Sequence, residues 1–202
     1  MVASRFVSGL RAVTLPAGHG LVRVHALNRG PVFFGPAPGG RPQNRFDAPD
    51  QEYRVLYAAE HLEGAFVETV LRRPVGRILR RASVEERGWS ILRPSRPLAL
   101  AKLFDDGLQF HQIDASEISV DNYAPSRALA LALYAEFNDL DGLAYRSRYN
   151  NGEICYAIFD RISPGEFDPG PVSPFVDHKD RVDAMMELYG AVFDTSLPIP
   201  PI

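Results

Sequence analysis

The segment from Arg45 to Glu68 constrains this chain more than any other. It reads RFDAPDQEYRVLYAAEHLEGAFVE and predicts a proline-containing loop, a short strand and a helix in direct succession. Arg45 falls in the loop, Tyr57 in the strand and Glu68 in the helix. Because little chain separates these elements, we expect a cation, an aromatic ring and a carboxylate to lie close together. Such groups can hold a phosphate, stack on a flat ring and stabilise a positively charged ribosyl centre.

The composition indicates one soluble domain and disfavours several classes of function. A chain of 202 residues fits a single domain with a sizeable core, and a hydrophobic share of 46% is ordinary for one. With a net charge of −3 and no strongly basic segment, direct nucleic-acid binding is disfavoured. No apolar run is long enough to span a membrane. Arginines interrupt the apolar residues at the N-terminus, so a signal peptide is not expected. We therefore expect a cytoplasmic protein without a membrane segment.

Cysteine and histidine are placed unfavourably for metal binding. Cys155 is the single cysteine, so an internal disulfide and a cysteine-rich metal site are excluded, and its apolar neighbours predict a small buried side chain. The five histidines are scattered without a paired motif, so we expect no metal site. The glycine-rich stretches match neither the dinucleotide-binding fingerprint nor the Walker loop. A dinucleotide would therefore need another kind of site.

Hydrophobic periodicity predicts an α+β fold with mixed or antiparallel sheets and packed helices, and not a regular βαβ repeat. The predicted strands are 21–27, 53–59, 97–104 and a hairpin over 142–160 that turns at NNGE. The predicted helices are 61–73, 125–139 and 178–194, the last with one apolar face. The remaining stretches are interpreted as an arm or short helix before Pro16, an exposed and partly helical segment at 76–89, and a turn at 106–114.

Arg45 and Tyr57 each allow two interpretations. The guanidinium of Arg45 could grip a phosphate, but the loop is rich in acids and favours a salt bridge to Asp47 or Asp50. Tyr57 could be a core tyrosine whose hydroxyl bonds to backbone, which is the commoner role of a tyrosine in a strand. Alternatively its ring is a stacking platform and its hydroxyl is free to bond a ribose.

Glu68 is balanced between a functional and a structural interpretation. Apolar residues surround most of its predicted helix, so a glutamate there lies either at the rim or against a pocket wall. The structural alternative is an exposed pair with Arg72 one turn later, which contributes only about 0.3–0.5 kcal/mol. Gly64, one turn earlier on the same face, leaves a gap through which a ligand could approach.

Two further candidates come from other strands. In the predicted hairpin, strand alternation puts Ser147 on one face with Leu143 and Tyr145, although a serine at a strand end is usually a turn or surface residue. In the first strand, Arg23 lies beside His25 on the polar face and could supply a second phosphate contact. A lone histidine is more often structural than catalytic.

Taken together, these stretches resemble the RES domain family, which is named for its arginine, glutamate and serine. The matching stretches are LVRVHA, VFFG followed by NRFDAP, VLYAAEHLEGAFVE, DGLAYRSR and CYAIFD, in the family's order. The resemblance implies an N-terminal arm (1–20), a RES-like NAD-processing domain (21–165) and a C-terminal extension (166–202) whose amphipathic helix packs on the core.

The resemblance implies a role for five residues. Arg45, Glu68 and Ser147 match the family's catalytic arginine, glutamate and serine, while Tyr57 and Arg23 match its strand tyrosine and first-strand arginine. Arg23 and Arg45 would hold the phosphates of NAD, and Tyr57 would stack on the nicotinamide. Glu68 would bond the ribose and stabilise the oxocarbenium-like charge. Ser147 would orient the nicotinamide amide or the attacking phosphate.

The implied activity is NAD cleavage at the nicotinamide–ribose bond on a fold like that of ADP-ribosyltransferase toxins. NAD would be the substrate, with inorganic phosphate the slightly favoured co-substrate and no prosthetic group. Several family members are toxins neutralised by a helix-turn-helix (Xre-like) antitoxin. Two alternatives stay open: a protein ADP-ribosyltransferase, and a catalytically silent nucleotide-binding module, since Asp47 places a negative charge near the proposed phosphate contact. A homodimer through the C-terminal helix is also open.

Overall fold

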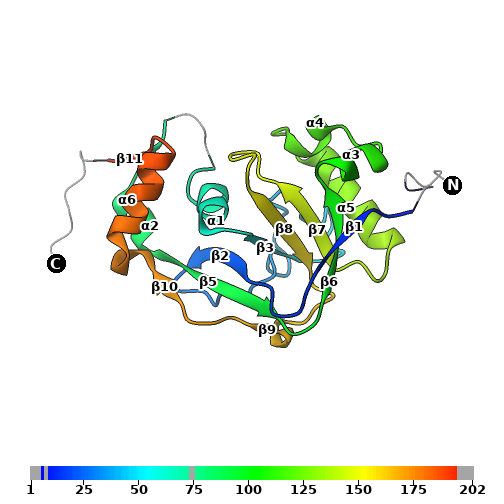
Figure 1. Cartoon of the computed structure of the whole chain (residues 1–202), viewed down its shortest axis with the longest axis horizontal. Helices are drawn as coiled ribbons and strands as arrows, with labels where there is room; N and C mark the ends of the chain where they lie inside the picture. Colours follow the sequence, from blue (N-terminus) through cyan, green and yellow to red (C-terminus); the bar gives the residue numbers. More distant parts are fainter. Residues whose placement is uncertain (1–5, 7–8, 73–75, 195–202) are drawn as a thin grey trace.

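A mainly antiparallel sheet of nine strands forms the framework of the molecule (Figure 1). The computed structural model describes residue 6 and residues 9–72 and 76–194. The strand order is β1-β6-β7-β8-β3-β2-β5-β10, with β9 also paired to β5, and only the β6–β7 pair is parallel among the pairs of this sheet. The fold is α+β with helices packed on the sheet, so the predicted fold class is confirmed.

The elements have the following bounds. The strands of the large sheet are β1 (Ala12–Leu15), β2 (Leu21–Ala26), β3 (Val55–Ala59), β5 (Arg87–Pro94), β6 (Leu98–Leu103), β7 (Gly142–Arg146), β8 (Ile154–Phe159), β9 (Phe167–Asp168) and β10 (Ser173–Pro174). A second, parallel pair consists of β4 (Ile78–Leu79) and β11 (Val192–Phe193). The α-helices are α1 (Leu62–Thr69), α2 (Arg81–Glu85), α3 (Asp106–Phe110), α4 (Ala115–Ser119), α5 (Ala124–Glu136) and α6 (Lys179–Leu188).

Most predicted elements are present, and four segments differ from the prediction. The predicted helix 178–194 ends at Leu188 as α6, because Gly190 adopts a left-handed backbone conformation, and residues 192–193 form the strand β11. Residues 12–15, before Pro16, form β1, which pairs with β6, because Val13 and Thr14 are β-branched and suit a strand. The segment 76–89 contains the predicted helical part as α2, but its end opens the long strand β5. The segment 106–114 is not only a turn, since it holds α3. The beginning of the predicted arm and residues 195–202 of the predicted extension lie outside the described residues.

The helices divide between the two ends and one face of the sheet. In Figure 1, α2 and α6 lie at one end, α3, α4 and α5 lie at the other, and α1 sits between them over β2 and β3. Alternate residues of β3 belong to two different hydrophobic clusters, with Val55 and Ala59 on the side of α1 and Leu56 and Ala58 on the opposite side. The sheet therefore has a packed cluster on each face, and α1 is pressed against one of them.

The strands β2 and β3 meet at a single point. Their register places Val22 opposite Ala59, whereas β2 pairs with β5 along its whole length from Leu21 to Ala26. Beyond Val22 the two strands separate, and the long loop 27–54 connects them. This separation opens a space in the middle of the sheet beneath α1, where the candidate site lies.

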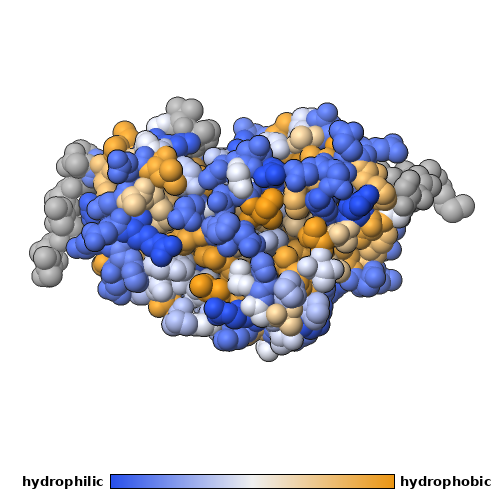
Figure 2. Space-filling model, viewed as in Figure 1, coloured by the Kyte–Doolittle hydropathy of each residue, from blue (hydrophilic) through white to orange (hydrophobic). Residues whose placement is uncertain are grey.

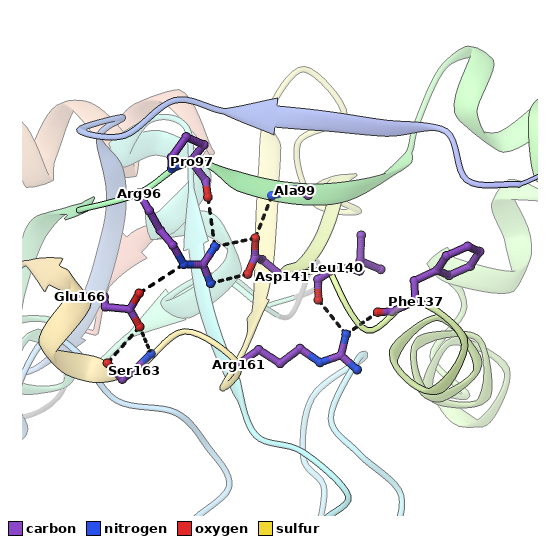
Figure 3. Close-up of polar contacts among 9 residues, drawn as sticks. All are labelled: Arg96, Pro97, Ala99, Phe137, Leu140, Asp141, Arg161, Ser163 and Glu166. Atoms are coloured by element: carbon purple, nitrogen blue, oxygen red, sulfur yellow. Dashed lines mark hydrogen bonds and ion pairs between the residues drawn. The ribbon is translucent and has the colours of Figure 1, made fainter.

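A partly buried ion pair, in which Asp141 is buried and Arg96 is not, joins the start of β7 to β6 (Figure 3). The guanidinium of Arg96 donates two hydrogen bonds to the carboxylate of Asp141, at 2.6 and 3.0 Å, and the backbone N–H of Ala99 donates to the same carboxylate at 2.9 Å. Arg96 also bonds Glu166 at 3.2 Å. Beside this network, Arg161 donates to backbone carbonyls at the end of α5 and in the turn that follows it, including that of Leu140 at 3.0 Å. The contacts of Asp141 with Arg96 and Ala99 join β6 to the start of β7, which is the parallel pair among the described strands of the large sheet.

Replacing Asp141 by alanine is expected to lower the free energy of unfolding by about 2–3 kcal/mol, because the change leaves the N–H of Ala99 without its acceptor and removes two charge-assisted hydrogen bonds of Arg96, which keeps only Glu166 and the carbonyl of Pro97. Urea unfolding followed by circular dichroism measures the loss. The matched control is Asp139→Ala, which removes an exposed carboxylate two residues earlier and should change stability by less than about 0.5 kcal/mol. Equal losses in the two variants would contradict the assigned role of the ion pair.

The face of the molecule drawn in Figure 2 has no broad hydrophobic patch. On this face, hydrophobic residues are interspersed with hydrophilic ones. Among the described helices, none has the length and apolar character that crossing a bilayer requires. On α6, Val182, Met185 and Met186 are buried and belong to the larger hydrophobic cluster. The apolar face of this helix therefore packs inward.

Candidate active site

A pocket of about 300 Å³ lies where β2 and β3 separate. It is lined by consecutive residues of both strands, by α1, by the loop that carries Arg45, and by β7 and β8. The polar and aromatic lining residues are Arg23, Asn44, Arg45, Tyr57, Glu68, Thr69, Arg72, Arg87, Tyr123 and Tyr145. Four of the five residues proposed from the sequence, all except Ser147, therefore face one cavity.

Glu68 is the acidic residue of this pocket. The helix α1 buries Leu62, Ala65 and Phe66 against the sheet, which turns the partly buried Glu68 toward the opening. Its Oε1 accepts a hydrogen bond from the hydroxyl of Ser147 at 2.7 Å and lies 3.9 Å from Nη2 of Arg45. The pair with Arg72 that helical spacing suggested is not formed in the described part of the chain, because Arg72 donates to Asn44 Oδ1 at 2.9 Å.

Ser147 is held by the turn that follows β7. Its Oγ accepts hydrogen bonds from the backbone N–H groups of Tyr149, at 3.1 Å, and Asn150, at 3.2 Å. A hydroxyl has one proton to donate, and here that proton goes to Glu68. Ser147 is itself only 1% exposed. Ser147 therefore lies outside the lining of this pocket and fixes the position of the Glu68 carboxylate through its hydrogen bond to Oε1.

Arg45 is fixed through its backbone. Its carbonyl accepts a hydrogen bond from Ser126 Oγ at 2.8 Å, and the carbonyl of Asn44 accepts one from Arg127 Nε at 3.0 Å, so the start of α5 holds the loop. The side chain is 7% exposed and lies over the ring of Tyr145 at 5.3 Å. Its Nη1 is buried and has no hydrogen-bond partner among the described residues. A buried cation with an unused donor is suited to an anionic ligand.

The acids of the loop around Arg45 do not pair with it. Asp47 is fully buried, and its carboxylate accepts from the backbone N–H of Gln43 at 2.8 Å and of Asn44 at 2.7 Å. Within the described residues Arg45 has no ion pair with Asp47 or Asp50, so the salt bridge favoured by the loop composition is wrong. Asp47 instead closes its own loop, and its charge is satisfied there.

Tyr57 contributes its ring to the pocket, but its hydroxyl is already engaged. The hydroxyl donates to Asp47 Oδ1 at 2.9 Å and accepts from the backbone N–H of Phe46 at 3.0 Å. Burial, together with the nearby carboxylate of Asp47, raises the pKa of Tyr57 well above its ordinary value. The hydroxyl is therefore not free to bond a ribose. Its two hydrogen bonds connect the strand β3 to the loop that carries Arg45.

Replacing Tyr57 by phenylalanine is expected to lower the free energy of unfolding by about 1–2 kcal/mol, because both hydrogen bonds of a buried hydroxyl are lost. Chemical unfolding measures this loss. Tyr149→Phe is the matched control, since it also removes one tyrosine hydroxyl and Tyr149 lies outside the lining of this pocket. A Tyr57→Phe protein as stable as the wild type would show that the hydroxyl does not hold the loop.

Arg23 and His25, neighbours on β2, have different surroundings. Arg23 lines the pocket, and its Nη1 is buried without a partner in the part of the chain that the structure describes. Burial and the nearby charge of Arg29 lower the pKa of Arg23 to about 10. The ring of His25 bonds Ser90 Oγ at 3.2 Å and a backbone carbonyl of Ala26 at 3.1 Å. His25 is thus a buried structural residue.

Gly64 does not provide the predicted gap. A Cβ atom at this position would lie 2.8 Å from Glu153 Oε2 and 3.2 Å from the Cβ of Ala59. The space above the glycine is occupied by the β3 and β8 side of the sheet, so glycine is needed for close packing of α1. Access to Glu68 is from the pocket side instead.

Four charged or aromatic lining residues were not proposed from the sequence as site residues. Tyr145 shares a strand face with Ser147, which was a usable signal, and Arg72 lies one turn after Glu68. Arg87 was assigned to an exposed segment, and nothing in the pattern marked Tyr123, which precedes α5.

Cys155 is buried as predicted, and burial raises the pKa of its thiol. In the described residues no group of three histidine, cysteine, aspartate or glutamate side chains is placed to hold a metal ion.

A second cavity of about 900 Å³ lies on the other side of Ser147, beside α3 and α4. It is larger, but its two arginines are paired: Arg146 with Asp105 at 3.0 Å and Arg148 with Asp121 at 2.7 Å. The smaller pocket has a carboxylate, aromatic rings and guanidinium groups with unused donors. The smaller pocket is therefore the better candidate for chemistry.

Comparison with known proteins identifies the family. A model of the RES domain matches residues 20–176, which is most of the chain. The chain belongs to the RES domain family. The RES match begins at β2 and extends through β10. It contains Arg23, Arg45, Tyr57, Glu68 and Ser147.

The RES protein also resembles a solved structure. A chain in the crystal structure of the M. tuberculosis MbcT–MbcA toxin–antitoxin complex superposes with a TM-score of 0.63 at 15% sequence identity. The superposition covers 84% of the RES protein and 92% of that chain. A search of curated proteins finds no match. At 15% identity this similarity establishes the fold alone, and the chemistry has to be argued from the residues of the pocket.

Proposed function

We propose that this RES protein cleaves NAD at the nicotinamide–ribose bond and acts as the toxin of a toxin–antitoxin pair. The observation that carries the proposal is the position of Glu68. Its carboxylate is anchored by Ser147, lies 3.9 Å from the guanidinium of Arg45, and faces a pocket of about 300 Å³. A fixed negative charge in a confined site is suited to a reaction in which positive charge develops on a ribose.

The reaction begins with departure of nicotinamide. The C1′–N bond breaks, its electron pair leaves with the nicotinamide ring, and the positive charge moves from the ring to the ribosyl carbon and ring oxygen. Oε1 of Glu68 is engaged by Ser147 and Arg45, while Oε2 accepts no hydrogen bond from the described residues and can bond the ribose hydroxyls. Because Glu68 is held before substrate arrives, little reorganisation is needed as the charge develops.

The remaining groups bind and orient. The buried Nη1 donors of Arg23 and Arg45, which have no partner among the described residues, are suited to phosphate oxygens. A bound anion would also stabilise the buried charge of Arg23 and so oppose the lowering of its pKa by burial. The ring of Tyr57 is the surface on which nicotinamide stacks. Inorganic phosphate, if it is the acceptor, attacks the ribosyl carbon through oxygen and yields ADP-ribose 1-phosphate. Water in its place yields ADP-ribose.

An antitoxin partner is part of the proposal. The similar M. tuberculosis structure is that of a toxin–antitoxin complex, and the family resemblance implies a helix-turn-helix (Xre-like) antitoxin. Induced expression in bacteria should arrest growth, and co-expression of the protein encoded in the adjacent reading frame should relieve the arrest. Unimpaired growth at high expression of an NAD-cleaving protein would argue against the toxin role.

The enzymatic proposal is tested by incubating purified protein with NAD and measuring nicotinamide. We expect nicotinamide release that becomes faster when inorganic phosphate is added. Binding of NAD without turnover would instead support a silent nucleotide-binding module. Transfer of label from the adenylate part of NAD to a macromolecule would support protein ADP-ribosylation. Release that is independent of phosphate and leaves free ADP-ribose would identify water as the acceptor.

A further inference from the structure

The lining of the candidate pocket carries an excess of positive charge. Arginines 23, 45, 72 and 87 face it, and Glu68 is the one acidic side chain among the described residues that line it. Four positive charges against one negative charge around a space of about 300 Å³ repel one another. The repulsion is strongest between Arg23 and Arg45, whose Nη1 atoms are buried, whereas Arg72 is exposed and Arg87 is partly buried. A ligand that supplies at least two negative charges in the same space would compensate them.

Two of these arginines have no role in the proposed function as stated. Arg72 follows α1 and donates from Nη2 to Asn44 Oδ1 at 2.9 Å, while Arg87, at the start of β5, donates to the backbone carbonyl of Ser83. Neither has an ion pair with a carboxylate in the part of the chain that the structure describes. A guanidinium has five N–H donors in a planar fork, so each has donors left for a ligand.

The position of these arginines relative to Glu68 suggests which part of a ligand they contact. Arg72 lies in the chain just after α1, which ends at Thr69, and Arg87 stands on β5 opposite Ala26, three residues along β2 from Arg23. In a nucleotide bound with its reacting ribose at Glu68, the diphosphate is attached through C5′, the one carbon outside the ribose ring. The pocket thus offers a carboxylate for the ribose and arginines beside it for the phosphates attached to that ribose.

We propose that Arg72 and Arg87, together with Arg23, form a diphosphate subsite that makes the pocket selective for ligands with a diphosphate bridge over those with one phosphate or none. A diphosphate diester carries two negative charges and several acceptor oxygens, which two or three guanidinium forks can share. This inference rests on the proposed function for the identity of the reacting ribose, but the binding of a diphosphate can be measured without any reaction.

The first test compares substrates. Arg72→Gln and Arg87→Gln should each raise the KM for NAD about tenfold, the effect expected from losing one charge-assisted hydrogen bond, with kcat nearly unchanged. Cleavage of nicotinamide riboside, which has no phosphate, should be the same in both variants and in the wild type. Arg54→Gln is the matched control, since Arg54 is half-exposed, pairs with Asp160 and lies outside the pocket lining. A KM for NAD unchanged in both pocket variants would overturn the inference.

The second test does not depend on cleavage. Calorimetric titration should show that wild-type protein binds ADP at least tenfold more tightly than AMP, and that this preference disappears in the Arg72→Gln/Arg87→Gln double variant. Lysine at both positions should retain part of the preference, because charge remains but the fork is lost. Thermal unfolding of each variant verifies that it is folded. Equal affinity of the wild type for ADP and AMP would overturn the subsite, whereas ADP selectivity without NAD turnover would overturn only the proposed function.

Discussion

Replacing Glu68 by glutamine is expected to reduce the rate of nicotinamide release at least about 10³-fold, a loss of about 4 kcal/mol of transition-state stabilisation. Glutamine keeps the size of the side chain and an oxygen that can accept the hydrogen bond from Ser147. The negative charge beside the ribose is the property that this variant loses. Because that charge acts on the transition state and hardly on the ground state, kcat should fall much more than the KM rises.

The matched control for this variant is Glu63→Gln on the same helix. Glu63 is also partly buried, but it lies outside the lining of the pocket, so its neutralisation should leave nicotinamide release within about twofold of the wild type. Thermal unfolding of both variants verifies their fold. A Glu68→Gln enzyme with full activity would remove Glu68 from the mechanism and with it the proposed route of cleavage.

The local part of the site could be predicted from the sequence because three elements follow one another closely. Arg45, Tyr57 and Glu68 are separated by so little chain that a loop, a strand and a helix must bring them together, and they do line one pocket. Ser147 is different, since it joins Glu68 from 79 residues away. The hairpin pattern predicted its strand, but only the family resemblance gave a reason to connect it with Glu68.

The charges of the arginine loop illustrate the limit of reasoning from composition. Counting acids near Arg45 favoured a salt bridge to Asp47, yet the Asp47 carboxylate is occupied by backbone N–H groups and by the hydroxyl of Tyr57. A carboxylate at a tight turn competes for nearby N–H donors, which are always available locally. The composition of a loop says which charges are present and leaves open the direction in which each one points.

The strand β5 was missed because its buried positions are not apolar enough. Its residues alternate between buried and exposed as a strand should, but the buried ones include Gly88, Ser90 and Pro94 beside Leu92. Without a hydrophobic repeat the segment resembles an exposed linker. Arg87, at the start of this strand, was therefore left out of the candidate site, although the strand places it in the pocket.

Replacing Ser147 by alanine is expected to lower kcat for nicotinamide release about 10²-fold with a smaller change in KM. The hydroxyl is the group that holds Oε1 of Glu68 at 2.7 Å, and its loss lets the carboxylate leave the position in which it meets the developing charge. The same change leaves the N–H groups of Tyr149 and Asn150 without their acceptor, so some loss of stability should accompany it. Ser95→Ala, at an exposed position outside both cavities, is the control for activity.

A double-mutant cycle separates positioning from direct contact with substrate. If Ser147 acts by holding the Glu68 carboxylate, then Ser147→Ala should cost almost nothing in a Glu68→Gln background, because the charge that it positions is already absent. The coupling between the two sites should then nearly equal the whole effect of Ser147→Ala, about 2.7 kcal/mol for a 10²-fold loss. Additive losses would mean that Ser147 contacts the nicotinamide or the acceptor itself. That outcome would require the hydroxyl to turn away from Glu68 when substrate binds.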